Sequence, residues 1–429
     1  MKKIITILSL SLLIFNPVFA DKYPKLKDPV KSISGSIKKL KVPGKIDLKD
    51  YTVKNPGYKI YIDVAKRRAE LKGHKNNYRL CKPFKNIELF PSMPEIGGHK
   101  WKQEDASPID FINFAEPMIE NMNKLVRGWL SSGDIFYLDK MKEQILLWSK
   151  ENAFNVLISD GYNSEWESDF AYIDTLENVR QTLVGMLIAF DVLRQEKALT
   201  PEEDKTIYDW FEKIVAKTSI GPNDGAKDKM PPGNHTEASK ARIYTLWGIL
   251  SGDDKYFQAG LKFYGIALNV TRKDGSSRHE IRKQKGKSNR SKRGLLKMTQ
   301  VVGGMVMIAE VFANQGYDLY SFETKKGVTV HTMVDFLITY IGYPKSGAKK
   351  KAYIDPEIMD TKRILRKTGI NDNTLGWAHA YVKRFPNKET TKKLIKYYLE
   401  PYGWSRYIQN SGGFGMHMSC AYANINKIK

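Results

Sequence analysis

Cysteine is scarce in this chain of 429 residues. Only Cys81 and Cys420 occur, and neither a CxxC nor an HExxH motif is present. Because structural and catalytic zinc sites usually carry such motifs, we expect no metal ion and no cofactor. Two cysteines in an oxidising compartment could form one disulfide across more than three hundred residues of chain. Two separate buried thiols are the alternative.

Long apolar runs are also missing after the first twenty residues, so no membrane-spanning helix is expected. At the start, Lys2 and Lys3 precede an apolar run over residues 4–15, and Val18, Phe19 and Ala20 follow. This order is typical of a secretory signal peptide that is cleaved after Ala20. The sequence therefore predicts a periplasmic or secreted monomer that is not inserted in a membrane.

Acidic residues are in the minority, since 70 Lys and Arg oppose 47 Asp and Glu and give a formal charge of +23. An exported protein with this charge is expected to meet an acidic polysaccharide rather than nucleic acid. A lysine-rich surface that is merely solvated is the alternative. The positive charge is concentrated between residues 272 and 293, where only Asp274 and Glu280 oppose it. Such a loop is either a solvated segment or a loop that holds a polyanion.

Strand patterns and fixed-length repeats are sparse, whereas apolar residues recur with the period of an α-helix. Residues 1–20 form the signal peptide, and residues 21–105, rich in Lys, Pro and Gly, predict an extended N-terminal arm or lid. Residues 106–429 predict an all-α domain, an incomplete (α/α) toroid of helical hairpins. Its helices are expected near 107–129, 134–146, 176–193, 200–214, 236–250, 254–268, 297–314, 328–341, 372–383 and 388–399.

The most informative segment precedes the predicted helix at 236–250. It reads Pro231-Pro232-Gly233-Asn234-His235-Thr236, so a defined turn is followed by residues that can cap a helix. A helix cap beside a chance histidine is the plain interpretation. Further along the chain come the acidic Glu280, the pair Arg290 and Arg293, and the run Met307-Ile308-Ala309.

This order of motifs resembles the alginate lyases of polysaccharide lyase family 5. Asn234 and His235 match an Asn-Asn-His motif in which Gly233 replaces the first asparagine. Weaker similarity covers about residues 100–414, including Lys100-Trp101, Arg180-Gln181-Thr182-Leu183 and Ser411-Gly412-Gly413-Phe414. The remaining matches are Glu280, Arg290, Arg293 and Met307-Ile308-Ala309.

The family cleaves uronate polymers by β-elimination, so the resemblance implies a polysaccharide lyase with the following site. Asn234 and Arg290 would neutralise the uronate carboxylate, and His235 would accept the C5 proton or share one with that carboxylate. Lys297 stands where the family has its catalytic tyrosine. The predicted substrate-binding residues are Arg293, Arg282, Lys283, Trp101 and Arg180.

Several alternatives stay open at Lys297. The register could differ by a few residues, Tyr244, Tyr162 or Tyr172 could replace the missing tyrosine, or Lys297 could transfer the proton after its arginine neighbours lower its pKa. Lys297 could equally be a surface lysine, and Trp101 a core tryptophan. A catalytically inactive polyuronate-binding protein would also lack the tyrosine.

A glycoside hydrolase on the same fold is a third functional class. It would need two carboxylates across a cleft, and the chain has an acidic cluster that could supply them. That cluster consists of Glu165, Glu167, Asp169 and Asp174.

Overall fold

The computed structural model describes most of the helical part of the chain. The described residues are 40–41, 48–56, 59–75, 77, 81–92, 95–96, 108–154, 156–157, 169–218, 234–281, 294–341, 375–400, 416–424 and 426. Within the helices, the side chains of 108–117, 169–178, 217–218, 234–236, 294, 296, 341 and 398 are outside this description.

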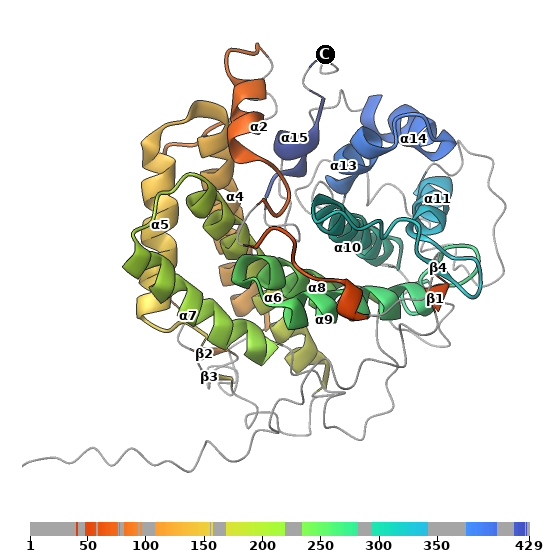
Figure 1. Ribbon diagram of the computed structural model, residues 1–429, viewed down its shortest axis with the longest axis horizontal. Coiled ribbons are helices and arrows are strands. Elements are labelled where there is room, and N and C mark those ends of the chain that lie inside the picture. The colour runs from red at the N-terminus through yellow and green to blue at the C-terminus, as the bar shows by residue number, and fades with distance from the viewer. Residues whose placement is uncertain are drawn as a thin grey trace, which may run out of the picture.

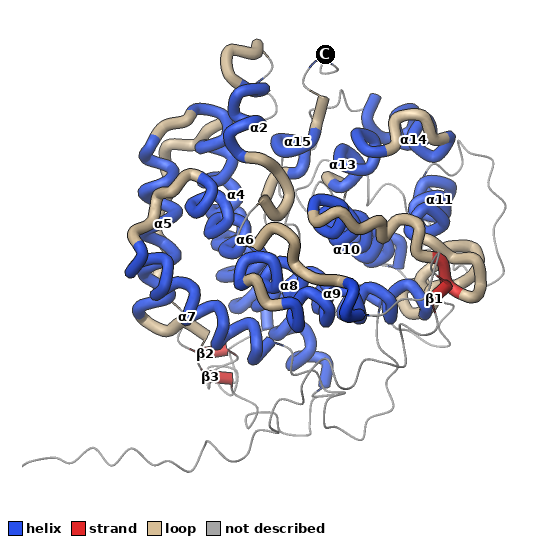
Figure 2. The backbone as a smooth tube through the Cα atoms, in the orientation of Figure 1, coloured by secondary structure: helices blue, strands red, loops and turns tan. Residues whose placement is uncertain are grey.

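Helices dominate the described residues, and they follow one another around a ring (Figure 1; Figure 2). The strands are pairs of two residues: β1 (Leu40–Lys41) is antiparallel to β4 (Glu323–Thr324), and β2 (Glu95–Ile96) is parallel to β3 (Val156–Leu157). The helices are η2 (Leu48–Asp50), α2 (Val64–Leu71), α4 (Pro108–Ser132), α5 (Ile135–Lys150), α6 (Asp169–Gln195), α7 (Pro201–Thr218), α8 (Asn234–Ser251), α9 (Asp254–Asn269), α10 (Gly294–Asn314), α11 (Val330–Ile341), α13 (Trp377–Arg384), α14 (Glu389–Leu394), the π-helical turn η7 (Ile395–Leu399) and α15 (Met418–Tyr422).

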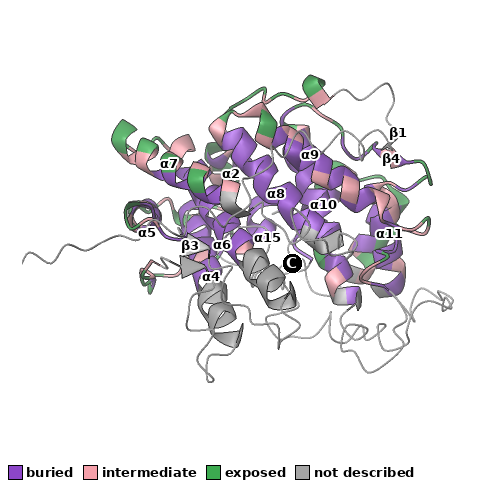
Figure 3. Ribbon diagram, turned by 90° about the horizontal axis from the view of Figure 1, so that it is seen from below, coloured by how far each residue is buried: buried purple, intermediate pink, exposed green. Residues whose placement is uncertain are grey.

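The ring has an inner and an outer layer. The inner helices α4, α6, α8 and α10 pack in succession, and α13 and α15 continue the series. Every described side chain of α8 from residue 237 to 250 is buried, whereas α7 carries exposed residues (Figure 3). This difference fits the sequence, because an outer helix needs one apolar face and an inner helix is covered on all sides. The architecture is the predicted all-α incomplete toroid of hairpins.

Local sequence features explain where two of the outer helices begin. The Thr200 hydroxyl accepts a hydrogen bond from the Glu203 N–H at 3.2 Å, and the Glu203 carboxylate accepts one from the Thr200 N–H at 2.9 Å. This is a reciprocal capping box at α7. Asp134 caps α5 by accepting the Phe136 N–H at 3.0 Å. These contacts satisfy N–H groups that have no partner within the helix.

The α8–α9 hairpin packs closely because glycines face the neighbouring backbone. A Cβ atom on Gly260 of α9 would lie 2.9 Å from the Thr245 nitrogen and 3.1 Å from the Ala241 oxygen of α8. Gly248 of α8 faces the Phe257 backbone in the same way. The absence of side chains at these two positions therefore sets the distance between the two helices.

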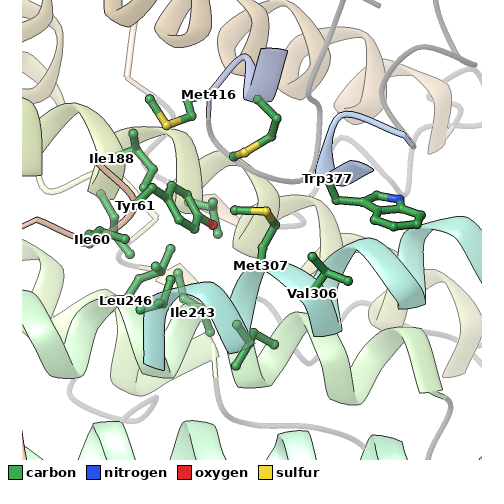
Figure 4. Packing of buried hydrophobic residues seen from close by; sticks show 14 of the residues in the cluster. Ile60, Tyr61, Ile188, Ile243, Leu246, Val306, Met307, Trp377 and Met416 are labelled. Atoms are coloured by element: carbon green, nitrogen blue, oxygen red, sulfur yellow. The ribbon is translucent and has the colours of Figure 1, made fainter. Parts of the chain in front are cut away.

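Residues 59–64 lie across one end of the ring and are held by polar side chains at helix C-termini. The Asp191 carboxylate near the end of α6 accepts the N–H groups of Lys59 at 3.1 Å and Ile60 at 3.0 Å. The Asn314 amide at the end of α10 donates to the Ile60 and Tyr61 carbonyls, each at 3.0 Å. Figure 4 shows Tyr61 among the apolar side chains of the interior, near Met307.

The first and last elements of the ring are joined covalently. Cys81 and Cys420 form a disulfide, with 5.1 Å between their Cα atoms. Both residues are fully buried. Beside it, Arg67 of α2 donates from Nε to the Cys420 carbonyl at 2.7 Å and from Nη2 to the Ala423 carbonyl at 3.0 Å. The disulfide confirms the first of the two alternatives for the cysteines.

The predicted helices are confirmed wherever the structure describes them, with ends that differ by a few residues. The sequence did not predict α2 or α15, which are eight and five residues long. Among the described helices, none combines the length and the apolar character that a membrane crossing requires.

Candidate active site

The helix α8 begins at Asn234, two residues before the predicted start, so Asn234 and His235 occupy its first turn. Their side chains lie outside the described residues. From His235, positions 239, 242 and 246 follow at the spacing of one helix face. Ser239 and Arg242 on this face are buried, at 2 % and 6 % exposure. The polar face that begins at His235 therefore continues into the interior of the ring.

Arg180, one of the predicted substrate-binding residues, lies against this face from the neighbouring helix α6. Its side chain is buried at 1 % exposure, and its Nε donates to the Ser239 hydroxyl at 3.2 Å. A buried arginine beside α8 makes the wall of the interior basic one turn below His235. Arg180 is thus positioned by the packing of α6 on α8.

Arg242 brings a second guanidinium group to the interior, two turns below His235. Burial raises the pKa of the Tyr61 hydroxyl well above its usual range. The positive charge of Arg242 acts in the opposite direction and lowers this pKa. The Tyr61 hydroxyl has no hydrogen-bond partner in the described part of the chain, although the residue is only 4 % exposed. Tyr61 and Arg242 were not singled out in the sequence, since residue 61 is far from the motifs and only the structure places it opposite α8.

Lys297 lies half-buried in the first turn of α10, which packs beside α8. A Cβ atom on Gly304 of α10 would be 3.3 Å from the Ala238 Cβ of α8. At the far end, Arg194 of α6 donates to the Leu250 carbonyl of α8 at 2.6 Å, and Ile60 binds both Asp191 of α6 and Asn314 of α10. The two helices therefore run in the same direction, and Lys297 and His235 lie at the same end of the ring.

The turn before α10 also reaches this end. Asp274 accepts hydrogen bonds from the Ser276 N–H at 3.1 Å and from the Ser276 hydroxyl at 2.7 Å, which shapes the turn at Asp274-Gly275. Ser277 then places its N–H 3.3 Å from the Met298 sulfur of α10. Glu280, the acidic residue of the motif, is half-buried three residues later. The structure thus brings Glu280 to the region where α10 begins.

Tyr244 is removed from the candidates for a catalytic tyrosine. It is fully buried, and its ring stacks on Tyr256 and Phe263 of α9, with centroids 6.0 and 5.5 Å away. It therefore faces the outer layer and not the interior of the ring.

Two further charged residues in α8 were missed in the sequence. Glu237 and Lys240 are buried at 3 % and 4 % exposure and approach to 3.9 Å. Lys240 also lies 5.3 Å from the Phe263 ring centroid, which places it toward α9. Their i, i+3 spacing at the start of a largely apolar helix could have indicated that the two side chains approach each other.

The remaining predicted site residues lie outside the described part of the chain. These are Arg282, Lys283, Arg290, Arg293 and Trp101. The alternatives Tyr162, Tyr172, Glu165, Glu167, Asp169 and Asp174 likewise have no described side chain. Within the described residues, no group of three His, Cys, Asp or Glu side chains is arranged to hold a metal ion.

Comparison with solved structures places the fold among alginate lyases. Alginate lyase A1-III from Sphingomonas species A1 superimposes with a TM-score of 0.60 at 18 % identity, covering 81 % of this chain and 93 % of that one. A variant of alginate lyase A1-III complexed with a tetrasaccharide gives a TM-score of 0.61 at 19 % identity, over 80 % and 92 % of the two chains. An alginate lyase from Bacteroides ovatus gives 0.56 at 16 % identity, over 86 % and 99 %.

Sequence comparison gives the same family. No curated protein sequence matches the chain. The family model described as alginate lyase matches residues 114–346, more than half of the chain. That range includes α8 with Asn234 and His235, the basic segment and α10 with Lys297. The chain therefore belongs to the alginate lyase family.

Proposed function

We propose that this protein is a periplasmic polysaccharide lyase that cleaves an acidic polyuronate, such as alginate, mannuronan or a glucuronan-like chain, by β-elimination. The observation that carries the proposal is the inner face of α8. His235 opens this face, and two buried guanidinium groups, Arg180 and Arg242, lie one and two turns deeper. A basic interior beneath a histidine suits a chain of carboxylate-bearing sugars.

The chemistry of β-elimination assigns a task to each residue type. Removal of the C5 proton leaves negative charge that spreads into the adjacent carboxylate, so that carboxylate must be neutralised. The Asn234 amide and the Arg290 guanidinium serve this purpose, because both donate hydrogen bonds to carboxylate oxygens. His235 accepts the C5 proton or holds a proton on the carboxylate.

The leaving O4 must receive a proton as its bond to C4 breaks. We assign this role to Lys297, which the resemblance aligns with the family's tyrosine and which lies at the same end of the ring as His235. In its ammonium form it donates the proton, and in its neutral form it could serve as the base. Arg282, Lys283 and Arg293 from the basic loop, with Trp101 from the N-terminal arm, would contact sugars on either side of the cleaved bond.

The second candidate is a catalytically inactive polyuronate-binding protein with the same fold. The lysine at position 297, which the resemblance aligns with the family's tyrosine, is the feature that favours it. Such a protein would retain acidic glycans without producing unsaturated sugars.

Ultraviolet absorbance tests these alternatives directly. The protein without residues 1–20 is mixed with polymannuronate, polyguluronate and glucuronan, each without added metal. A rise in absorbance indicates the C4–C5 double bond of a lyase product, and the responding polymer identifies the substrate. A flat trace with retardation in gels that contain the polymers supports the binding protein. New reducing ends without the double bond would instead indicate a hydrolase.

A further inference from the structure

A cavity of about 390 Å³ lies at the end of the ring opposite His235 and Lys297. Its walls come from α2, the end of α10, α13 and α15, which are the elements that join the first and last parts of the ring. We call it the seam pocket. Lys297 and Asn314 are at opposite ends of α10, so about 25 Å of helix separates the seam pocket from Lys297, while Tyr61 on the pocket wall lies toward Arg242 of α8.

The charges on the wall of the seam pocket do not cancel. Its three acidic residues are each paired with a cation. Asp63 pairs with Lys59 at 2.7 Å, and Glu70 pairs with Arg67 at 2.8 Å. Glu310 binds Arg384 through both carboxylate oxygens, with 2.8 Å from Nη2 to Oε2.

Two lysines, Lys66 and Lys383, remain on the wall after these pairings. No carboxylate in the described part of the chain forms an ion pair with either of them. Burial lowers the pKa of Lys383, and the charges of Arg67 and Lys66 act in the same direction, whereas Glu70 and Glu310 oppose them. With Arg67 and Arg384 these lysines give the wall four cations against three carboxylates, so its net positive charge favours an anion.

A second cavity of about 630 Å³ adjoins the seam pocket and shares Arg67, Glu70, Lys383 and Tyr422 with it. Its other walls include the amide side chains of Asn424 and Asn426, both exposed. Each cavity has the volume of a typical small-ligand site. The lysines can bind a carboxylate, and the adjacent amides can bind hydroxyl groups.

We propose that the seam pocket is a second binding site, remote from the active site, for a short acidic oligosaccharide. Lys66 and Lys383 bind the carboxylate of one uronate unit. Because the choice of an acidic sugar over another small anion rests on the proposed function, the test uses both a uronate and inorganic phosphate as probes.

Isothermal titration calorimetry with β-1,4-linked dimannuronate tests the site in the His235→Ala background, where cleavage is disabled. Lys66→Glu with Lys383→Glu is compared with a control of the same charge change, Lys255→Glu with Lys325→Glu, on exposed positions elsewhere. The first pair of changes is expected to raise the Kd of dimannuronate at one site per chain at least about tenfold, because a charge-assisted hydrogen bond contributes a factor of that size. The control is expected to bind as the parent does.

Equal binding by the two double variants would overturn the site. Binding of inorganic phosphate at the site without dimannuronate would overturn its assignment to an acidic sugar. The test of the lyase proposal is independent of the test of the seam pocket. The Lys66→Glu, Lys383→Glu enzyme with His235 intact is expected to keep the parental initial rate of cleavage. If dimannuronate binds at the seam pocket but the protein forms no product that absorbs ultraviolet light, the lyase proposal is wrong and the binding-site proposal is retained.

Discussion

At the scale of single residues, Lys297 is the position on which the proposed chemistry depends most. It is half-buried at the start of α10, and we propose that it takes the place of the family's tyrosine. We expect Lys297→Ala to lower kcat about 10²- to 10⁴-fold, because a positioned acid or base contributes that much. Initial rates of ultraviolet product formation measure the change.

Lys325→Ala, at an exposed position, is the matched control for the loss of one lysine. Lys297→Tyr is expected to retain part of the rate, since it restores the residue type of the family. Unchanged turnover in Lys297→Ala would show that another group transfers the proton.

Buried histidines give the protein a defined sensitivity to acid. Burial, together with the charge of nearby Arg67, lowers the pKa of His379 to about 4. Burial also lowers the pKa of His331 to about 4, and its Nδ1 lies 2.7 Å from the Tyr381 hydroxyl. A histidine with a lowered pKa in the folded state binds a proton more readily after unfolding. Its stabilising contribution is therefore complete above about pH 6.5 and is lost as the pH falls toward about 4.

We expect the free energy of unfolding to decrease over this interval, and the decrease to be smaller in His379→Gln. Urea unfolding of both proteins at several pH values between 7 and 4 measures the difference. The two proteins are compared by the slope of the free energy of unfolding against pH, because the substitution also changes the free energy of unfolding at neutral pH. Parallel curves would mean that His379 is not protonated on unfolding in this range.

At the scale of elements, the contact between α8 and α9 depends on Gly260. The alanine methyl group has no room beside Thr245 and Ala241, so Gly260→Ala is expected to cost about 1–3 kcal/mol of stability. Gly185, inside α6, is the control, because its nearest neighbour would be the Met122 Cβ at an ordinary 3.6 Å. Gly185→Ala is expected to be neutral or stabilising by up to about 1 kcal/mol, since alanine favours a helix. Thermal unfolding followed by circular dichroism distinguishes the two, and equal effects would contradict the packing explanation.

The long helices could be predicted from the sequence because their apolar positions repeat over three or more turns. In α2 and α15 the local pattern is too short, and both are stabilised by distant contacts such as that of Arg67 with the Cys420 carbonyl. The same limit applies to the site. Asn234, His235 and Lys297 are predicted from their motif, whereas Arg242 and Tyr61 meet only because residues 59–64 cross the end of the ring.

At the scale of the whole molecule, the disulfide is the one covalent contact between the two ends of the ring. It joins positions 339 residues apart, so it restricts the unfolded chain strongly. We expect Cys81→Ser with Cys420→Ser to lower the free energy of unfolding by about 3–5 kcal/mol. Denaturant unfolding with and without reductant measures it, and reductant should affect the parent but not the variant. If the free energy of unfolding of the parent is unchanged after reduction has freed both thiols, the disulfide does not stabilise the protein.

The same bond determines how the molecule would carry a mechanical load. A pull on the chain before Cys81 and after Cys420 first detaches the segment at residues 59–64, which is held by hydrogen bonds and by buried apolar side chains but by no covalent bond to the ring. The tension then passes through the sulfur–sulfur bond and bypasses everything between the two cysteines. The helices α4 to α14 would therefore bear no force until a reductant opens the bond, and the extension measured at rupture would reveal whether it had been closed.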